Sequence, residues 1–429
     1  MSEAAQAARR IIARCRELAQ VSDVPGQTTR LFLSPATREA HLLVGGWIRE
    51  AGLKLRIDAI GNLRGLLGSE DLPRFVIGSH LDTVIDAGAF DGPLGVMLGI
   101  ELAHASAHDH LPFAIEVIGF SEEEGVRFAK PFLGSLAATG ELSENILGLR
   151  DAEGVTLRQA VAEFGLDITL LPEAHLSESA VAYLEFHIEQ GPVLDSDGEP
   201  VAVVQAIAGQ SRIQVSFHGH SNHAGTTPMG RLRRDALAAA SEWVTEVERY
   251  ASGCEGLVAT VGNLEVPGGA ANVIAGRCFA TLDVRHAEDA VRLQAVESIT
   301  AAARQAGERR RVAVEFKTSL DQTAVPMDTV LADNLAAACA RFTGKPARRI
   351  TSGAGHDAMI LAGRLPPAML FLRSPGGVSH HPTESVNVSD VEAAYGAGLE
   401  FLRSLRDDRA MFDLLVKRAS NHRREAQNA

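Results

Sequence analysis

The sequence predicts an α/β fold, with a mostly parallel sheet in one large domain and a smaller α+β domain inserted into it. Three observations predict this. The chain has 429 residues, more than one hydrophobic core usually organises, so roughly two to three domains are expected. Amphipathic helices alternate with short apolar strands in the first half, which is typical of a parallel sheet covered by helices. Around Ala208-Gly209-Gln210 this pattern gives way to a compact group of alternating strands, and after Pro326 it resumes.

The first part of the chain alternates helix and strand. A helix is expected near the N-terminus, because Ile11 and Leu18 lie on one face at helical spacing. A second helix opens at Ser34-Pro35, where serine caps the first turn and proline fits the first position, and Gly52 closes it. The next elements are strands at 75–78, 113–120 and 180–187, with a helix at 93–102 between the first two strands.

The inserted segment is expected to form a small sheet with two helices. Its strands are expected at 212–218, 257–264, 276–285 and 312–316, with a helix at 235–250 and another before the last strand. Helices at 328–342 and 388–405 and a strand at 368–372 follow. The parts 1–208 and 325–429 are therefore expected to complete one domain, with 209–324 inserted as a lid. The polar tail 417–429 is expected to fray.

The composition excludes several classes of protein. A net charge of −13 argues against a nucleic-acid binder, because neutralising phosphates requires a basic face. No apolar run approaches the ~18 residues of a membrane span, and the N-terminus lacks the apolar core of a signal peptide. The four cysteines lack CxxC spacing. We therefore expect reduced thiols, no nucleic-acid or membrane partner, and a cytoplasmic location.

Acidic and imidazole side chains follow two of the expected strands. His80 and Asp82 come after the strand at 75–78, with Asp91 close behind, and the run Glu122-Glu123-Glu124 follows the strand at 113–120. The carboxyl ends of parallel strands meet at one edge of a sheet, so these groups should cluster. Alone, the first pair could satisfy a strand end, and the acids could form a solvated turn. Together they offer the bridging carboxylate, flanking ligands and separate base that a two-metal hydrolase needs.

Two later segments add imidazoles. His187 ends the strand expected at 180–187 and faces away from Phe186 and Ile188, its neighbours in the sequence. His380 and His381 lie in a loop that also contains two glycines. Neutral imidazoles combined with hard carboxylates form a ligand set for divalent metal ions, zinc among them.

Six segments resemble the M20 metallopeptidase clan, and within it the amidase branch that cleaves ureido and carbamoyl groups. The resemblance extends through nearly the whole chain and is strongest to the allantoate amidohydrolases of that branch. It is carried by the segments 83–88, 124–128, 187–192, 207–210, 223–229 and 352–359. It implies a di-metal hydrolase catalytic domain at 1–208 and 325–429, and a lid and dimerisation domain at 209–324.

The resemblance implies two divalent metal ions per subunit, Mn²⁺ in the first place, with Zn²⁺ also suited to these ligands. The implied metal ligands are His80, Asp91, Glu124, His187 and His380, with Asp91 bridging. Glu123 is implied as the catalytic base, and Asp82 as the group that supports His80 and fixes its tautomer. His381 stands where the family has asparagine, so the choice between His380 and His381 stays open.

The resemblance also implies the substrate-binding residues, which are Gln190, His223, Asn272, Arg285 and His356. His223 would stabilise the oxyanion in the partner subunit's site of a homodimer joined through the lid. Arg285 would bind a substrate carboxylate through its planar donor fork, although an ion pair with Asp283 or Glu288 is the alternative.

The implied reaction is hydrolysis of the ureido C–N bond of allantoate, a small ureido compound of purine catabolism, to ureidoglycine, ammonia and carbon dioxide. An N-carbamoyl-L-amino-acid hydrolase with the same machinery is the alternative. The segment 187–192 resembles the ureido-cleaving branch and so disfavours an aminopeptidase or deacylase of the clan. A non-catalytic binding protein that kept the fold is disfavoured because every ligand and the base are present.

Overall fold

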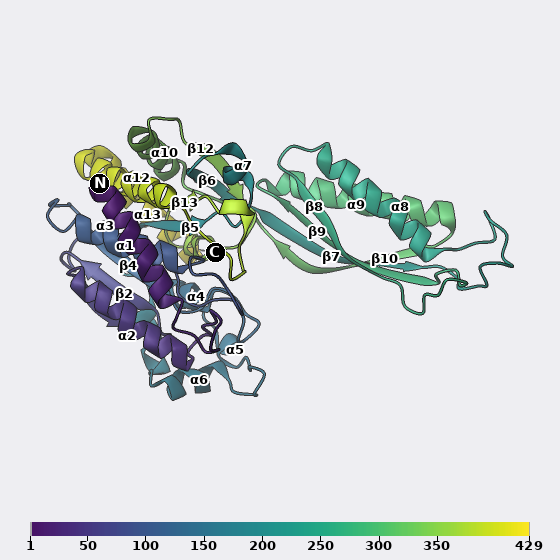
Figure 1. Ribbon diagram of the computed structural model, residues 1–429, viewed down its shortest axis with the longest axis horizontal. Coiled ribbons are helices and arrows are strands. Elements are labelled where there is room, and N and C mark those ends of the chain that lie inside the picture. The colour runs from purple at the N-terminus through teal and green to yellow at the C-terminus, as the bar shows by residue number, and fades with distance from the viewer. Residues whose placement is uncertain (1, 429) are drawn as a thin grey trace. The chain divides into compact units, whose positions relative to one another are not determined.

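The computed structural model describes residues 2–428 and divides into two compact units (Figure 1). The first unit contains the chain up to Gln205, Met327–Ile350 and the chain from Gly355 onward. The second contains Ala206–Pro326 and the short return Thr351–Ala354. Each unit has its own sheet and its own hydrophobic core.

The larger sheet, which lies mainly in the first unit, has nine strands in the order β1-β2-β4-β3-β5-β13-β6-β11, with β12 beside β6. These strands are β1 Lys54–Ile57, β2 Leu63–Leu67, β3 Arg74–His80, β4 Ala114–Phe120, β5 Ala180–Ile188, β6 Val201–Ile207, β11 Val325–Pro326, β12 Arg348–Ser352 and β13 Pro367–Leu372. The four central strands β4, β3, β5 and β13 run parallel, which confirms the predicted parallel sheet. The outer strands β1, β2, β6 and β11 pair antiparallel, which the sequence did not predict.

Helices cover this sheet. The long ones are α1 Glu3–Leu18, α2 Pro35–Glu50, α3 Pro93–Ala105, α10 Thr329–Thr343, α12 Val388–Asp407 and α13 Arg409–Asn428. The short ones are α4 Leu133–Thr139, α5 Glu144–Leu147, α6 Leu157–Phe164, α7 Val193–Asp197, α11 Asp357–Leu361, and the 3₁₀ helices η1 Ile168–Ala174 and η2 Pro375–Gly377. Ser34 caps α2 as predicted, because its side chain accepts a hydrogen bond from the Thr37 N–H. The tail expected to fray lies in α13, which extends to Asn428, and its fraying stays a prediction; Ala429 lies outside the described residues.

The helix α3 is buried from Pro93 through Ala103, so it is apolar on all sides rather than amphipathic. Its single carboxylate, Glu101, is buried and is paired by Arg10 and Arg14 of α1. The ion pairs therefore fix α1 on α3, and α3 packs on β3, the strand that ends at His80.

The second unit contains a sheet and two helices, as predicted, and the structure adds that the sheet is antiparallel. Its strands β7 Gly209–His218, β8 Val258–Glu265, β9 Arg277–His286 and β10 Ala313–Gln322 lie in the order β10-β7-β9-β8. The helices are α8 Ala236–Ser252 and α9 Asp289–Arg310. Alternate residues of β7 and β9 are buried, and Phe217 packs near Trp243, whose indole N–H donates to the Ile299 carbonyl at 3.0 Å.

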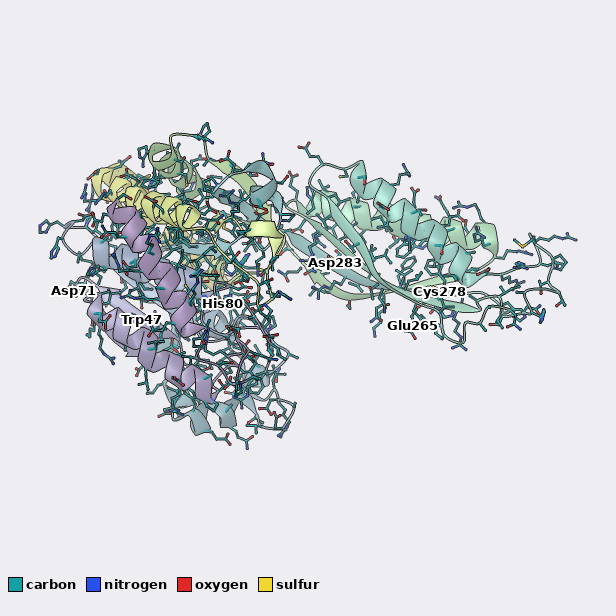
Figure 2. The ribbon with its side chains drawn as sticks, in the orientation of Figure 1. Trp47, Asp71, His80, Glu265, Cys278 and Asp283 are labelled. Carbon is teal, nitrogen blue, oxygen red and sulfur yellow. The ribbon has the colours of Figure 1, made fainter. Side chains whose placement is uncertain are left out.

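The state of the cysteines and the character of the helices were also predicted from the sequence. All four cysteines are free thiols, as predicted, and Cys278 of β9 is among the buried ones (Figure 2). Within residues 2–428, no helix combines the length and the apolar character needed to cross a membrane.

Candidate metal centre

Three parallel strands deliver the candidate ligands to one edge of the sheet. His80, the last residue of β3, is paired in register with Phe120, the last residue of β4, so the acid run starts beside it. On the other side of β3, Gly78 is paired with Glu185 of β5, which places His187 level with His80. The edge is the carboxyl edge, where open α/β sheets place their sites.

Three groups of potential ligand atoms lie at this edge, and the atoms within each group are less than 4.8 Å apart. The groups are His80, Asp91 and His187; His80, Glu123 and Glu124; and Asp91, Glu124 and His380. Asp91 belongs to two of them, with Oδ1 3.1 Å from His187 Nε2 and Oδ2 3.1 Å from His380 Nε2. The structure thus brings together all five residues predicted as ligands, in an arrangement that suits a bridging Asp91. Their role as ligands stays a prediction.

The hydrogen bonds of two imidazoles fix which nitrogen is free. His80 Nδ1 lies 3.1 Å from the Asp82 carbonyl oxygen, and His187 Nδ1 lies 2.9 Å from the Ile188 carbonyl oxygen. A carbonyl only accepts, so Nδ1 carries the proton in each ring and Nε2 is the atom that can bind a metal. Both Nε2 atoms face Asp91.

Asp82 organises the acid run. Its carboxylate accepts hydrogen bonds from the backbone N–H groups of Glu123 at 3.0 Å and Glu124 at 3.1 Å, and Oδ1 lies 3.4 Å from His80 Nδ1. Glu122 instead folds back to accept from the Gly125 N–H and belongs to none of the three ligand groups. Asp82 therefore holds both the ring of His80 and the turn that presents the next two acids.

The electrostatics of this edge favour a bound cation. Burial raises the pKa of Glu124 to about 7, with Asp91 adding to the rise and His80 opposing it. Burial also raises the pKa of Glu123 well above its usual range. Buried carboxylates that crowd together hold protons unless a cation replaces them, and imidazole and carboxylate donors suit divalent transition metals. The residues present therefore fit the implied ions.

The loop after η2 also contacts the Asp91 segment, through two residues, Ser379 and Glu384, that the sequence analysis did not identify. The hydroxyl of Ser379 donates to Asp91 Oδ2 at 3.0 Å, and the Glu384 carboxylate accepts from the N–H groups of Phe90 at 2.9 Å and Asp91 at 3.0 Å. His380 has a φ of 55°, and this backbone conformation accompanies its approach to Asp91. His381 is exposed, with Nδ1 2.8 Å from the Thr383 hydroxyl, and lies in none of the three ligand groups.

Two of the predicted substrate residues lie beside these groups. The side-chain amide of Gln190 donates to Asp91 Oδ2 at 3.0 Å, and its nitrogen is 3.3 Å from His380 Nε2. The buried ring of His356 has its centroid 4.5 Å from that of His187. Burial, together with the neighbouring His187, holds the pKa of His356 well below its usual range, so the ring is neutral.

The other three predicted substrate residues lie in the second unit. His223 is exposed, and its Nδ1 accepts from the N–H groups of Gly225 at 3.1 Å and Thr226 at 3.2 Å. The neutral ring therefore carries its proton on Nε2, as a donor. Asn272 is next to this turn, since its carbonyl accepts from the Ala224 N–H at 2.8 Å. Arg285 makes the ion pair with Asp283 that was the alternative interpretation, with Nε 2.7 Å from Oδ1.

Arg285 and His223 lie at opposite ends of the sheet in the second unit. Arg285 is paired with Gln210 at the start of β7, whereas His218 at the end of β7 is paired with Arg277. His223 and Asn272 lie beyond that second end, next to each other through the bridge between His223 and Val273. From 277 to 285 the strand rises roughly 26 Å, at about 3.3 Å per residue. Within one chain, His223 and Arg285 are therefore farther apart than the length of a small substrate.

Comparison with known proteins adds independent information. The chain matches the model of peptidase family M20/M25/M40 over residues 76–404. It is 38% identical to allantoate deiminase 1 of Glycine max, with 92% of this chain and 89% of that protein covered. It is 40% identical to an N-carbamoyl-L-amino acid amidohydrolase of Geobacillus stearothermophilus, with 87% and 93% covered. A hydantoinase/carbamoylase family amidase from Burkholderia ambifaria has a similar structure, with a TM-score of 0.86, 32% identity, and 93% of this chain and 97% of that chain covered.

Proposed function

The chain belongs to peptidase family M20/M25/M40, and on that premise we propose that it is a metal-dependent amidohydrolase that cleaves the ureido C–N bond of allantoate. The observation that carries the proposal is the pair of ligand groups that share Asp91, with Glu123 next to them. The products would be ureidoglycine, ammonia and carbon dioxide. The four free cysteines suit a reducing compartment, so we place the reaction in the cytoplasm.

Five side chains would hold two divalent ions, namely His80, Asp91, Glu124, His187 and His380. Mn²⁺ is the ion we propose, and Zn²⁺ is the alternative for the same donors. When bound, such ions supply Lewis acidity toward water and toward the ureido carbonyl. Glu123 takes the proton from the attacking water and then delivers it to the leaving nitrogen. Its burial supports this role, because a pKa raised above the ordinary value makes the carboxylate a better proton acceptor.

The second unit would act as a lid and as the dimer contact. His223 presents an Nε2–H donor that can stabilise the developing oxyanion. Arg285 can bind the substrate carboxylate with its guanidinium, which Asp283 orients. These two residues lie at opposite ends of β9 and its neighbours, so a single small substrate that touches both needs two chains. We therefore propose a homodimer in which His223 and Asn272 of the partner subunit complete the site, with Gln190 and His356 lining it.

The second candidate is an N-carbamoyl-L-amino-acid hydrolase, favoured by the 40% identity to a carbamoylase. Both reactions release ammonia, so one assay compares them. The Mn²⁺-loaded protein would be tested on allantoate and on N-carbamoyl-L-amino acids with small and large side chains. A higher kcat/KM for allantoate supports the proposal, and a higher value for a carbamoyl amino acid supports the second candidate. Release of ammonia from neither compound would overturn both.

A further inference from the structure

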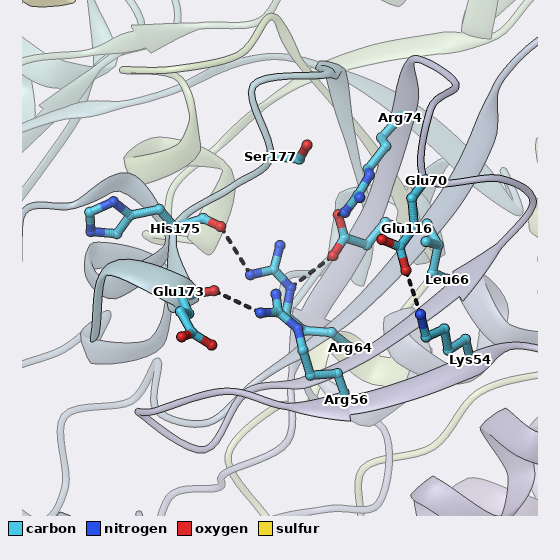
Figure 3. Close-up of a pocket in the computed structure, with 10 residues that line it drawn as sticks. All are labelled: Lys54, Arg56, Arg64, Leu66, Glu70, Arg74, Glu116, Glu173, His175 and Ser177. Carbon is cyan, nitrogen blue, oxygen red and sulfur yellow. Dashed lines mark hydrogen bonds and ion pairs between the residues drawn. The ribbon is translucent and has the colours of Figure 1, made fainter. Parts of the chain in front are cut away.

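A cavity of about 320 Å³ lies in the first unit, away from the metal centre (Figure 3). Its lining comes from β1, β2, β3 and β4 and from the segment between η1 and β5. Arg74, which lines it, is the first residue of β3, and His80 is the last. The strand rises roughly 20 Å between them, at about 3.3 Å per residue. The cavity and the metal centre are therefore separate sites.

The lining is unusually cationic for a protein of net charge −13. Four cationic side chains, those of Lys54, Arg56, Arg64 and Arg74, face three carboxylates. Glu116 is shared, because its Oε1 is 2.8 Å from Arg64 Nε and its Oε2 is 3.4 Å from Arg74 Nη1. Arg56 has a backbone partner, the Glu173 carbonyl oxygen at 2.8 Å. Arg64 has a second carboxylate neighbour, the buried Asp58, whose Oδ2 lies 3.9 Å from Arg64 Nη1.

Two donors in this lining have no partner. Arg64 has a side chain that is only 2% exposed, and its Nη2 is buried without a hydrogen bond. Arg74 Nε is likewise buried without one. In Figure 3 the third nitrogen of Arg64 points away from its two dashed bonds, toward the side where Ser177 lies. An unsatisfied buried donor is destabilising, and more so when it is charged, so an acceptor oxygen placed here would stabilise the fold.

We propose that this cavity binds a small oxyanion, a phosphate or carboxylate group, between Arg56, Arg64 and Arg74. Guanidinium groups match both anions through paired N–H donors, which a lysine or a water molecule cannot reproduce. The anion would connect the strands β2 and β3 to the segment before β5, since Arg64 already donates to the Ala174 carbonyl at 2.8 Å. It would act on the stability of the sheet from the edge opposite the metal centre.

Oxyanion binding can be tested by calorimetric titration of the Mn²⁺-loaded protein. One titration uses sodium phosphate and a second uses sodium malonate, both at a constant ionic strength set by sodium chloride. Saturable binding of at least one anion is expected. The anion that binds more tightly shows whether the cavity prefers a phosphate or a carboxylate group. The variants Arg56→Gln and Arg74→Gln should each weaken this binding at least about tenfold, the scale of one hydrogen bond to a charged group. Arg9→Gln, an exposed change of the same charge on α1, is the matched control.

A third variant gives a change in the opposite direction. Glu116→Gln removes the carboxylate that competes for Arg64 and Arg74, so the anion should bind more tightly and raise the melting temperature more than in the unchanged protein. Melting without anion checks that each variant is folded. If Arg74→Gln does not fold, the exposed Arg56 carries the test. The proposal would be overturned if phosphate and malonate bind no more tightly than chloride. It would also be overturned if their affinity in both arginine variants equals that in Arg9→Gln. Phosphate held only at the metal centre would be lost in Asp91→Ala and kept in the arginine variants, which also overturns it.

Discussion

The strand β4 leads to two kinds of buried carboxylate, and their surroundings differ. Glu116, near the start of β4, is buried beside Arg64 and Arg74. Burial alone would raise its pKa, but these two cations outweigh burial and lower it. Glu124, just after the end of β4, is also largely buried, yet burial and nearby carboxylates raise its pKa to about 7. The chain supplies the counter-charge for Glu116 from its own arginines. At the acid run it assembles histidines and further acids instead.

The difference teaches what each cluster is built to hold. A buried carboxylate that is hydrogen-bonded to a guanidinium has its counter-charge within the protein. Several buried carboxylates grouped around histidines can instead be balanced by a bound cation. The same reasoning applied to the cation side identifies the anion cavity, where Arg64 Nη2 and Arg74 Nε are buried without a hydrogen-bond partner. Changes at the two ends of β4 should therefore have opposite consequences for ligand binding and for folding.

The largest expected effect follows removal of the metal. Chelation should abolish activity and added Mn²⁺ should restore it, because the carboxylates at this edge need a cation. Asp91→Ala should lose both ions, since Asp91 belongs to two of the ligand groups, and mass spectrometry of the metal content measures this. Glu116→Gln is the matched control at the arginine end of β4 and should keep its metal. Full activity in metal-stripped protein would refute the two-metal mechanism.

The next effect concerns the base within the acid run. Glu123→Gln keeps the shape of the side chain and should largely keep the metal, yet turnover should fall at least about a hundredfold, the usual scale for a general base. Glu122→Gln is the control, because Glu122 accepts from the Gly125 N–H and belongs to none of the ligand groups. If Glu122→Gln is inactive and Glu123→Gln is not, the assignment of the two acids is reversed.

A third prediction concerns the lid. His223→Ala should bind metal normally and turn over about a hundred- to a thousandfold more slowly, the cost of losing one oxyanion donor. Mixing the inactive His223→Ala and Glu123→Gln proteins under conditions of subunit exchange should restore activity. Some heterodimers would then contain one site with both groups intact. Verified exchange without recovery would mean that His223 does not act across a dimer.

The sequence predicted the parts of the fold whose pattern is local. The central strands β3 and β5 are continuous apolar runs, and Ser34-Pro35 marks the start of α2, so both kinds of element could be recognised. The strands β1 and β2 were missed because they are short and contain Arg56 and Arg64. Arg64 is buried against partners distant in the sequence, among them Glu116, 52 residues later, and no local pattern reports such a partner.

The candidate site shows the same limit. His80 and His187 were recognisable because each follows an apolar strand, but Ser379 and Glu384 were not, since their contacts with the Asp91 segment span 288 residues or more. The choice between His380 and His381 depends on one positive φ angle, which the sequence does not specify. Side chains at strand ends can be predicted in this chain, and the loops that complete their surroundings cannot.

The smallest expected effect is on stability alone, at the arginine end of β4. Glu116→Gln leaves Arg64 with Asp58 as its remaining carboxylate, so the free energy of unfolding at pH 7 should fall by about 2 kcal/mol, the scale of one hydrogen bond to a charged group. The pKa of Glu116 is lowered in the folded state below its ordinary value of 4.5, so its contribution is present above that value. It is lost as the pH falls through the lower, folded-state pKa. Urea unfolding at several pH values should therefore show a difference between the two proteins that is constant near neutrality and shrinks in acid.

Glu70→Gln, which removes an exposed partner of Lys54, is the control and should change stability little at any pH. A difference that persists undiminished in acid would mean that Glu116 acts through packing rather than charge, and the contrast between the two ends of β4 would not be electrostatic.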